Sequence, residues 1–149
     1  MIIQNAVKVT CTKKPVYLVS THSHDFQSME MPNGKMVAVD GGRSYIRRCF
    51  TTHLDGYEEW NLDTMKSDFN ECVAKLLWGT RGKNGDEPLT YVLLYDCNVA
   101  HLKAILDTQP QIKDTIYERV IQHLLYLKRL FAIKTKPVRR IKKNILKKL

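Results

Sequence analysis

The sequence has no long uninterrupted run of apolar residues, although 44% of its 149 residues are hydrophobic. A membrane-spanning helix needs about 20 consecutive apolar residues, so the sequence predicts no transmembrane segment. The first ten residues, MIIQNAVKVT, also lack the positive region and apolar stretch of a secretory signal. We therefore expect a protein of the cytoplasm.

Cysteine is scarce, and the four that occur form no pairs. Cys11, Cys49, Cys72 and Cys97 are widely separated, with no C-x-x-C motif. Structural zinc sites and disulfide frameworks both rely on regularly spaced cysteines. We therefore expect reduced thiols, no metal and no cofactor.

Sequence motifs of known catalytic chemistry are absent as well. The chain has no nucleophile elbow, no H-E-x-x-H and no EF-hand loop. The glycine-rich stretch from Trp78 to Gly85 does not match a phosphate-binding loop, because only two residues separate its first two glycines and Asn84 follows Lys83. We expect a chain that is not an enzyme, in which Trp78 and Arg81 are candidates for a small recognition surface.

Acidic residues are missing from the last 22 positions, which hold ten of the 24 Lys and Arg residues. The net charge of +9 therefore leaves −1 for residues 1–127. Beyond Pro137, apolar residues recur at helical spacing among Arg139, Arg140, Lys142 and Lys143. We predict a single domain over residues 1–135 and a basic amphipathic tail over 136–149. Such a tail could bind a membrane, nucleic-acid phosphates or an acidic protein, or it could be a solvated terminus.

The order of the apolar patterns predicts an α+β fold, with small antiparallel β-hairpins at the N-terminus followed mostly by helices. Pro32-Asn33-Gly34 lies between two strand-like runs and predicts a hairpin in which Gly34 has positive φ. Val37 and Val39 should then be buried. The other elements are expected as strands over 7–11, 16–19, 45–50 and 89–95, a helix over about 63–77, a loop over 79–88, a helix after Asn98 that ends before Pro110, and a helix capped by Asp114 with an apolar stripe from Ile116 to Phe131.

His22, His24 and Asp25 form the most conspicuous polar cluster, with Asp40 as a further member. Two histidines at positions i and i+2 of a strand point the same way and can share a metal. No further ligand stands at a usual spacing, so the alternative is that these side chains satisfy backbone groups at the start of a strand.

Arg43, Arg47 and Arg48 follow the turn at Gly41 and Gly42. Arginine forks suit phosphates and carboxylates, so these residues are candidates for anion binding. The alternative is that they pair with the acidic stretch over residues 55–71.

Several of these motifs together resemble a family of small uncharacterised bacteriophage proteins. They are Ser20-Thr21-His22-Ser23-His24-Asp25-Phe26, Val39-Asp40-Gly41-Gly42, Tyr45-Ile46-Arg47-Arg48, and the segments 78–88 and 101–109. The family has no established activity. Some relatives carry two cysteine pairs around the histidines, like a zinc ribbon, whereas here Cys11 is alone. The resemblance implies a phage protein of the host cytoplasm that keeps a degenerate ribbon without zinc.

Three functional hypotheses follow. The first is a non-enzymatic phage accessory protein that binds a host or phage macromolecule, with a protein as the expected partner. The second is a nucleic-acid-associated protein that uses the tail and the cluster from Arg43 to Arg48. The third is an enzyme with a His/Asp site at His22, His24, Asp25 and Asp40, for which a pocket joining all four side chains would speak.

Overall fold

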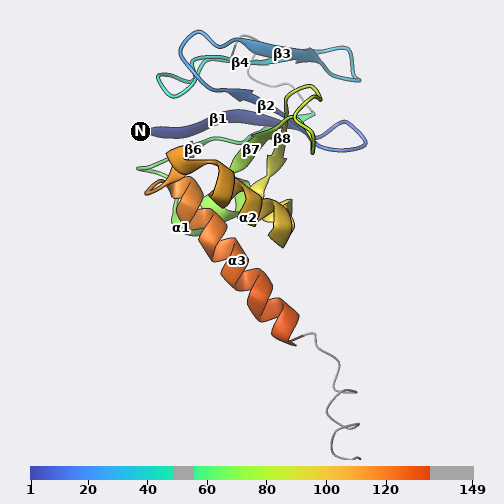
Figure 1. The fold of residues 1–149 in the computed structure, drawn as a ribbon. Helices are drawn as coiled ribbons and strands as arrows, with labels where there is room; N and C mark the ends of the chain where they lie inside the picture. Colours follow the sequence, from blue (N-terminus) through green and yellow to red (C-terminus); the bar gives the residue numbers. More distant parts are fainter. Residues whose placement is uncertain (49–55, 135–149) are drawn as a thin grey trace, which may run out of the picture. The chain divides into compact units, whose positions relative to one another are not determined.

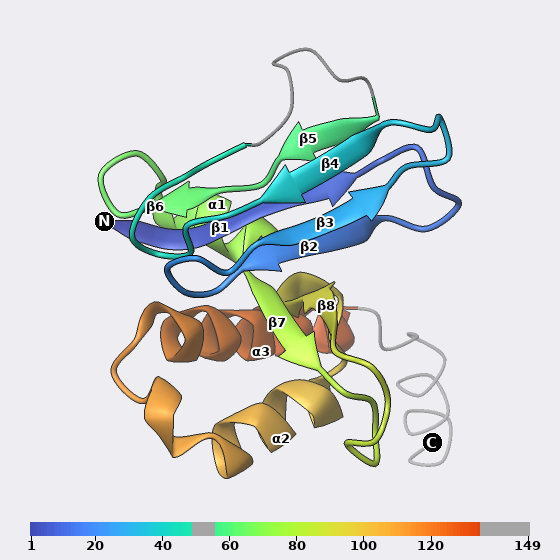
Figure 2. The same cartoon turned by 90° about the horizontal axis from the view of Figure 1, so that it is seen from above.

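The computed structural model describes residues 1–48 and 56–134, which divide into two compact units, Met1–Asn98 and Val99–Leu149. The fold is α+β, as the sequence predicted (Figures 1 and 2). The prediction of one domain over 1–135 stays a prediction, and the tail over 136–149 lies outside the described residues. The elements of the first unit are β1 (Ile2–Val9), β2 (Val16–Ser20), β3 (Gln27–Glu30), β4 (Met36–Val39), β5 (Tyr57–Glu59), β6 (Leu62–Asp63), α1 (Phe69–Lys75), β7 (Leu77–Thr80), β8 (Thr90–Leu93) and the 3-10 turn η1 (Leu94–Asp96).

The main sheet of the first unit is built around β1, which pairs antiparallel with β2 on one side and with β5 and β6 on the other. Val7 lies opposite Leu18 of β2 and Glu59 of β5. β1 ends at Val9, and Pro15 directly precedes β2, since proline is tolerated at the beginning of a strand. In the strand order β2-β1-β5, β2 lies at the end.

The predicted hairpin is confirmed as β3 and β4, joined through residues 31–35. Gly34 has φ +80°, and its N–H donates to the carbonyl oxygen of Met31 over 2.9 Å. Val37 and Val39 are buried, as predicted. The turn sequence therefore fixes both the hairpin and its register.

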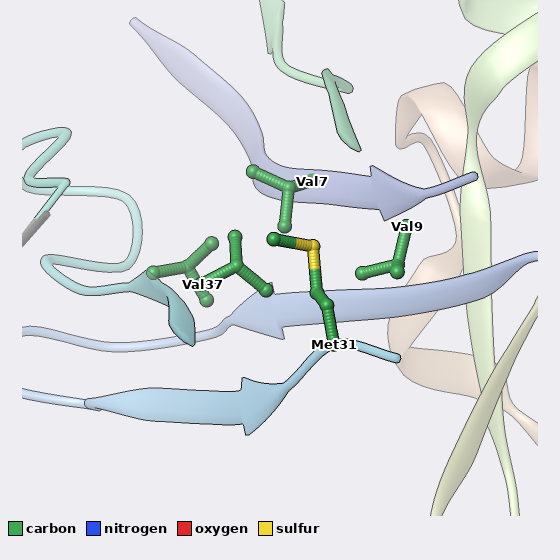
Figure 3. Close-up of a cluster of buried hydrophobic side chains, with 5 residues drawn as sticks. Val7, Val9, Met31 and Val37 are labelled. Atoms are coloured by element: carbon green, nitrogen blue, oxygen red, sulfur yellow. The ribbon is translucent and has the colours of Figure 1, made fainter. Parts of the chain in front are cut away.

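The β3–β4 hairpin lies over one face of the main sheet (Figures 1 and 2). Their shared core is a cluster of five buried residues: Val7, Val9, Met31, Val37 and Val39. Figure 3 shows the Met31 side chain reaching from the hairpin toward Val7 and Val9 of β1. Burial of these side chains holds the hairpin on the sheet.

The predicted helix over 63–77 is shorter in the structure, where α1 spans only Phe69–Lys75. The strands β5 and β6 precede it, and Asp63 belongs to β6. The Asp63 carboxylate accepts from the Met65 N–H over 2.8 Å and holds a turn there, while Asp68 caps α1 by accepting from the Glu71 N–H over 2.8 Å. Because of these local side-chain hydrogen bonds, the helix begins after Asp68 and not after Asp63.

The strand β7 (Leu77–Thr80) was also missed, because Leu77 was assigned to the preceding helix and Gly79 and Thr80 to a loop. It pairs antiparallel with β8, in register from Leu77↔Leu93 to Thr80↔Thr90. The predicted strand over 89–95 is confirmed in its first part and gives way to η1 at Leu94. Over residues 45–48, the predicted strand is reduced to one bridge between Asp40 and Arg47.

The second unit holds α2 (Val99–Thr108), the 3-10 turn η2 (Pro110–Ile112) and α3 (Ile116–Lys134). α2 begins after Asn98 and ends before Gln109-Pro110, as predicted. Asp114 was wrongly predicted as the cap of the next helix: it has φ +61°, and its N–H donates to the Glu118 carboxylate over 2.7 Å. α3 buries Val120, Ile121 and Leu124, while the later part of the predicted stripe is exposed, with Phe131 at 70%. No helix in the described part of the chain is long and apolar enough to cross a membrane.

Candidate functional site

An open groove of about 550 Å³ lies within the first unit, where β2 and β8 approach each other. Its volume falls in the range of about 300–1,000 Å³ that is usual for ligand sites. One wall is the consecutive stretch Pro15–Val19 and the other is Leu89–Tyr91. Thr21, His22, Asp25 and Gln27 supply polar groups.

The groove runs along the edge of β2 rather than across one of its faces. Side chains of a strand alternate between the two faces, so a cavity on one face would be lined by every second residue. Here all five residues from Pro15 to Val19 line the groove. Because β2 ends the strand order of its sheet, the groove opens onto the edge that no described strand pairs with.

Apolar side chains dominate the body of the groove. Val16 is 38% exposed and Leu89 is 47% exposed, so both offer apolar surface to an occupant. The Tyr17 ring packs against the Trp60 ring, with 5.9 Å between the ring centroids. Burial raises the pKa of Tyr17, and the charges of Asp96 and Glu58 raise it further, so its hydroxyl stays neutral.

Asp25 forms the polar end of the groove, in the segment that follows β2. Its Oδ2 accepts from the Thr21 N–H over 2.7 Å and from the Thr21 hydroxyl over 3.0 Å, while Oδ1 accepts from Gln27 Nε2 over 2.7 Å. Burial works against its charge, but these hydrogen bonds and the nearby His22 outweigh burial and lower the pKa of Asp25. Across the groove, burial raises the pKa of Tyr91, and the Asp25 charge raises it further. The groove therefore ends in a fixed negative charge.

The four residues of the predicted polar cluster divide between two places. His22 and Asp25 line the groove, whereas His24 and Asp40 are not among its lining residues. His24 has φ +65° and its Nδ1 lies 3.3 Å from the Tyr45 hydroxyl. Asp40 is buried and accepts from the Gly41 N–H over 2.7 Å. The pocket that the enzyme hypothesis required to join all four side chains is not this groove.

The contacts of His22 lack the geometry of a proton relay. Thr21 Oγ1 lies 3.1 Å and Asp25 Oδ2 lies 3.8 Å from the same ring nitrogen, Nδ1. A nucleophile and an orienting carboxylate would engage opposite nitrogens of the ring. Within residues 1–48 and 56–134, no three His, Cys, Asp or Glu side chains are placed to hold a metal ion.

The three arginines of the predicted cluster differ in their contacts. Arg48 donates to the Glu59 carboxylate from Nε over 3.0 Å and from Nη2 over 2.7 Å, and it also donates to the side-chain oxygens of Asn5 and Asn61. Arg43 and Arg47 are exposed, and the Arg47 guanidinium lies 5.8 Å from the Tyr45 ring centroid. Arg48 thus joins strands. Arg43 donates from Nε to the Ile2 carbonyl oxygen over 3.3 Å, and Arg47 Nη1 lies 3.9 Å from Asp40 Oδ2, but both side chains are exposed and are the members that an external anion could reach.

The other predicted binding residues lie elsewhere. Trp78 is half-buried on β7, and Arg81 is exposed at the start of the following loop. Arg139, Arg140, Lys142 and Lys143 lie outside the described residues. The groove residues themselves, such as Val16, Leu89 and Tyr91, were missed by the sequence analysis. The available signal was Pro15, since proline at the start of a strand is typical of a sheet edge.

The comparisons with known proteins add no relative. No family model, no curated protein and no solved structure matches the chain. The resemblance to a family of phage proteins therefore stays a prediction.

Proposed function

We propose that this chain is a non-enzymatic binding protein that captures an extended segment of a partner protein along the edge of β2. The observation that carries the proposal is the lining of the groove by five consecutive residues, Pro15–Val19. An extended peptide can add to a sheet edge through backbone hydrogen bonds, while flanking pockets select its side chains. Val16 and Leu89 are the apolar surfaces that such a segment would cover.

The proposal agrees with the expectation of a phage accessory protein that acts on a protein in the host cytoplasm. A nucleic-acid role remains the alternative, for which Arg43 and Arg47 are the exposed members of the arginine cluster. The groove favours the protein partner, because its walls are apolar and its charged end is a carboxylate, which repels phosphates.

The test is selection of binding peptides from a displayed library of random decapeptides, followed by measurement of their affinities. Val16→Arg and Leu89→Arg place a long charged side chain in the groove at exposed positions, so the fold should survive. Met65→Arg is the matched control, because Met65 is 86% exposed and does not line the groove. We expect the groove variants to lose the selected peptides and the control to keep them.

A backbone scan of the best peptide distinguishes strand addition from other modes of binding. N-methylation removes one backbone donor at a time, and alternate residues of a strand point their N–H groups to opposite edges. Loss of affinity should therefore follow a period of two residues. Selected peptides that bind the groove variants as well as the parent would refute the proposal. A concentration-dependent dimer that Val16→Arg abolishes would assign the edge to a second copy of the chain instead.

A further inference from the structure

The polar end of the groove identifies the chemistry of the segment it takes, an inference that rests on the proposed function. We infer that the bound segment carries a Lys or Arg side chain that pairs with the Asp25 carboxylate. The body of the groove would cover apolar residues of the same segment. The occupant is thus an extended peptide that combines apolar residues with one basic residue at a fixed position.

The first argument is the hydrogen bonding of Asp25. An ionised carboxylate offers about four acceptor sites. Three are taken, by the Thr21 N–H, the Thr21 hydroxyl and Gln27 Nε2. These donors are neutral, so they orient the carboxylate without neutralising its charge. Within the described ranges 1–48 and 56–134, its ion-pair contact is with His22 Nδ1, at 3.8 Å.

The second argument is the sign of the charge around the groove. Burial is the largest cause that raises the pKa of Tyr91, and the Asp25 charge raises it further, so the charge of Asp25 acts on a residue of the opposite wall of the groove. The Asp25 side chain is only 11% exposed, so water screens it less than a carboxylate on an open surface. A basic side chain that enters this end meets a preformed, oriented acceptor.

The third argument is that the opposite end carries the opposite sign. Lys13 and Lys14 immediately precede Pro15, where the groove begins along β2. A segment with a basic residue at the Asp25 end meets attraction, while the same residue at the Pro15 end meets two lysines. The groove should therefore bind its segment in one direction and one register.

The experiment is a double-mutant cycle between Asp25 and the basic position of a groove-dependent peptide from the selection. The protein variants are Asp25→Asn and, as a control that removes one negative charge away from the groove, Glu30→Gln on β3. The peptide variants replace the basic residue by Gln. We expect the peptide change to weaken binding about tenfold in the parent and in Glu30→Gln, as for a hydrogen bond between charged groups, and to have almost no effect in Asp25→Asn.

Three outcomes separate this inference from the proposed function. If no selected peptide depends on Val16 and Leu89, the proposed function itself fails. If groove-dependent peptides lack a preferred basic residue, or if the two changes are additive, the function stands and the inference is overturned. A further peptide keeps the test valid even if Asp25→Asn misfolds, because it is measured on the parent protein. The peptide with Glu at the basic position should bind more weakly than the peptide with Gln, and equal binding would also overturn the inference.

Discussion

Asn5 holds the backbone of Asp40 from the middle of the neighbouring sheet: its Nδ2 donates to the Asp40 carbonyl oxygen over 2.8 Å. The same amide lies 3.1 Å from the carbonyl oxygens of Gly42 and Tyr45, and its Oδ1 accepts from Arg48 over 2.9 Å. One buried side chain on β1 therefore organises the whole turn after β4. That turn also packs against the backbone of the His22 segment beside the groove.

Asn5→Asp should destabilise the first unit strongly. The substitution keeps the shape but sets a carboxylate oxygen against three carbonyl oxygens. We expect a loss of about 3 kcal/mol or more in unfolding free energy, since each buried group left unsatisfied costs about 1–3 kcal/mol. Asn33→Asp is the matched control, because Asn33 lies at an exposed turn, where its side-chain oxygen accepts from the Lys35 N–H. Urea denaturation measures both, and equal stabilities would contradict the role of Asn5.

Gly42→Ala should cost more stability than Gly34→Ala, although both glycines have positive φ. The left-handed conformation costs about 1–2 kcal/mol at either position. A Cβ at Gly34 would meet nothing within 4 Å, whereas at Gly42 it would collide with the backbone of His22. Overpacking adds about 1–3 kcal/mol at Gly42.

Both alanine variants carry the cost of the left-handed backbone conformation, so this cost cancels when they are compared. Thermal and urea denaturation should therefore show Gly34→Ala to be more stable than Gly42→Ala. Equal losses would mean that the turn does not press against the His22 segment. Because that segment forms the polar end of the groove, Gly42→Ala should also weaken peptide binding.

Arg48→Lys should lower stability, whereas Arg43→Lys and Arg47→Lys should leave it nearly unchanged. Lysine cannot reproduce the fork that Arg48 presents to Glu59, Asn5 and Asn61. Hydrogen bonds of charged groups contribute about 1.5–3 kcal/mol, so we expect a loss of about 2 kcal/mol for Arg48→Lys. Urea denaturation of the three variants is the measurement, and three equal stabilities would show that Arg48 is not the structural member.

The fold was predictable where the signal is local. Pro32-Asn33-Gly34 turns the chain between β3 and β4, and Gln109-Pro110 ends α2, because both act through their own backbone angles. The helix before Leu77 was placed wrongly because its start depends on whether Asp63 or Asp68 caps it, and both are plausible from sequence. The division of labour among Arg43, Arg47 and Arg48 depends on β5, which the sequence analysis missed.

The walls of the groove could not be predicted from the sequence for a different reason. Val16 and Leu89 are 73 residues apart, and only the packing of β2 against β8 brings them to the same site. Asp25 was identified as part of a polar cluster because it directly follows His22 and His24 in the sequence. Sequence reasoning therefore found the end of the groove but not its walls.

The stability of the protein should fall in acid partly through Asp25. The pKa of Asp25 in the fold is below its ordinary value of 3.8, so the unfolded chain binds the proton more readily. The resulting stabilisation is fully present above that ordinary value and is lost as the pH falls through the folded pKa. Asp25→Asn should therefore show a smaller loss of stability between about pH 5 and pH 2 than the parent.

Some acid dependence should remain in Asp25→Asn because of Asp63. The Met65 N–H is the largest influence on the pKa of Asp63 and lowers it. The measurement is the urea midpoint at a series of pH values for the parent, Asp25→Asn, Asp63→Asn and the double variant. The differences give the contribution of each carboxylate to the pH dependence of stability. An unchanged pH profile in Asp25→Asn would contradict the fixed charge on which the basic-residue preference depends.

Peptide binding in the groove and anion binding by the tail should be separable. The last 14 residues contain seven Lys and Arg residues and no acid, and the groove lies entirely within residues 15–91. Changing Arg139, Arg140, Lys142 and Lys143 together to Gln should therefore lower the salt concentration at which the protein elutes from heparin. The same variant should keep the affinity of a groove-dependent peptide within about twofold, since long-range charge effects are screened at physiological salt. Unchanged heparin elution would move the anion-binding role to Arg43 and Arg47, which double substitution by Gln would then test. A loss of peptide affinity in the tail variant would instead mean that the basic segment takes part in binding, and that the partner must complement both the groove and the tail.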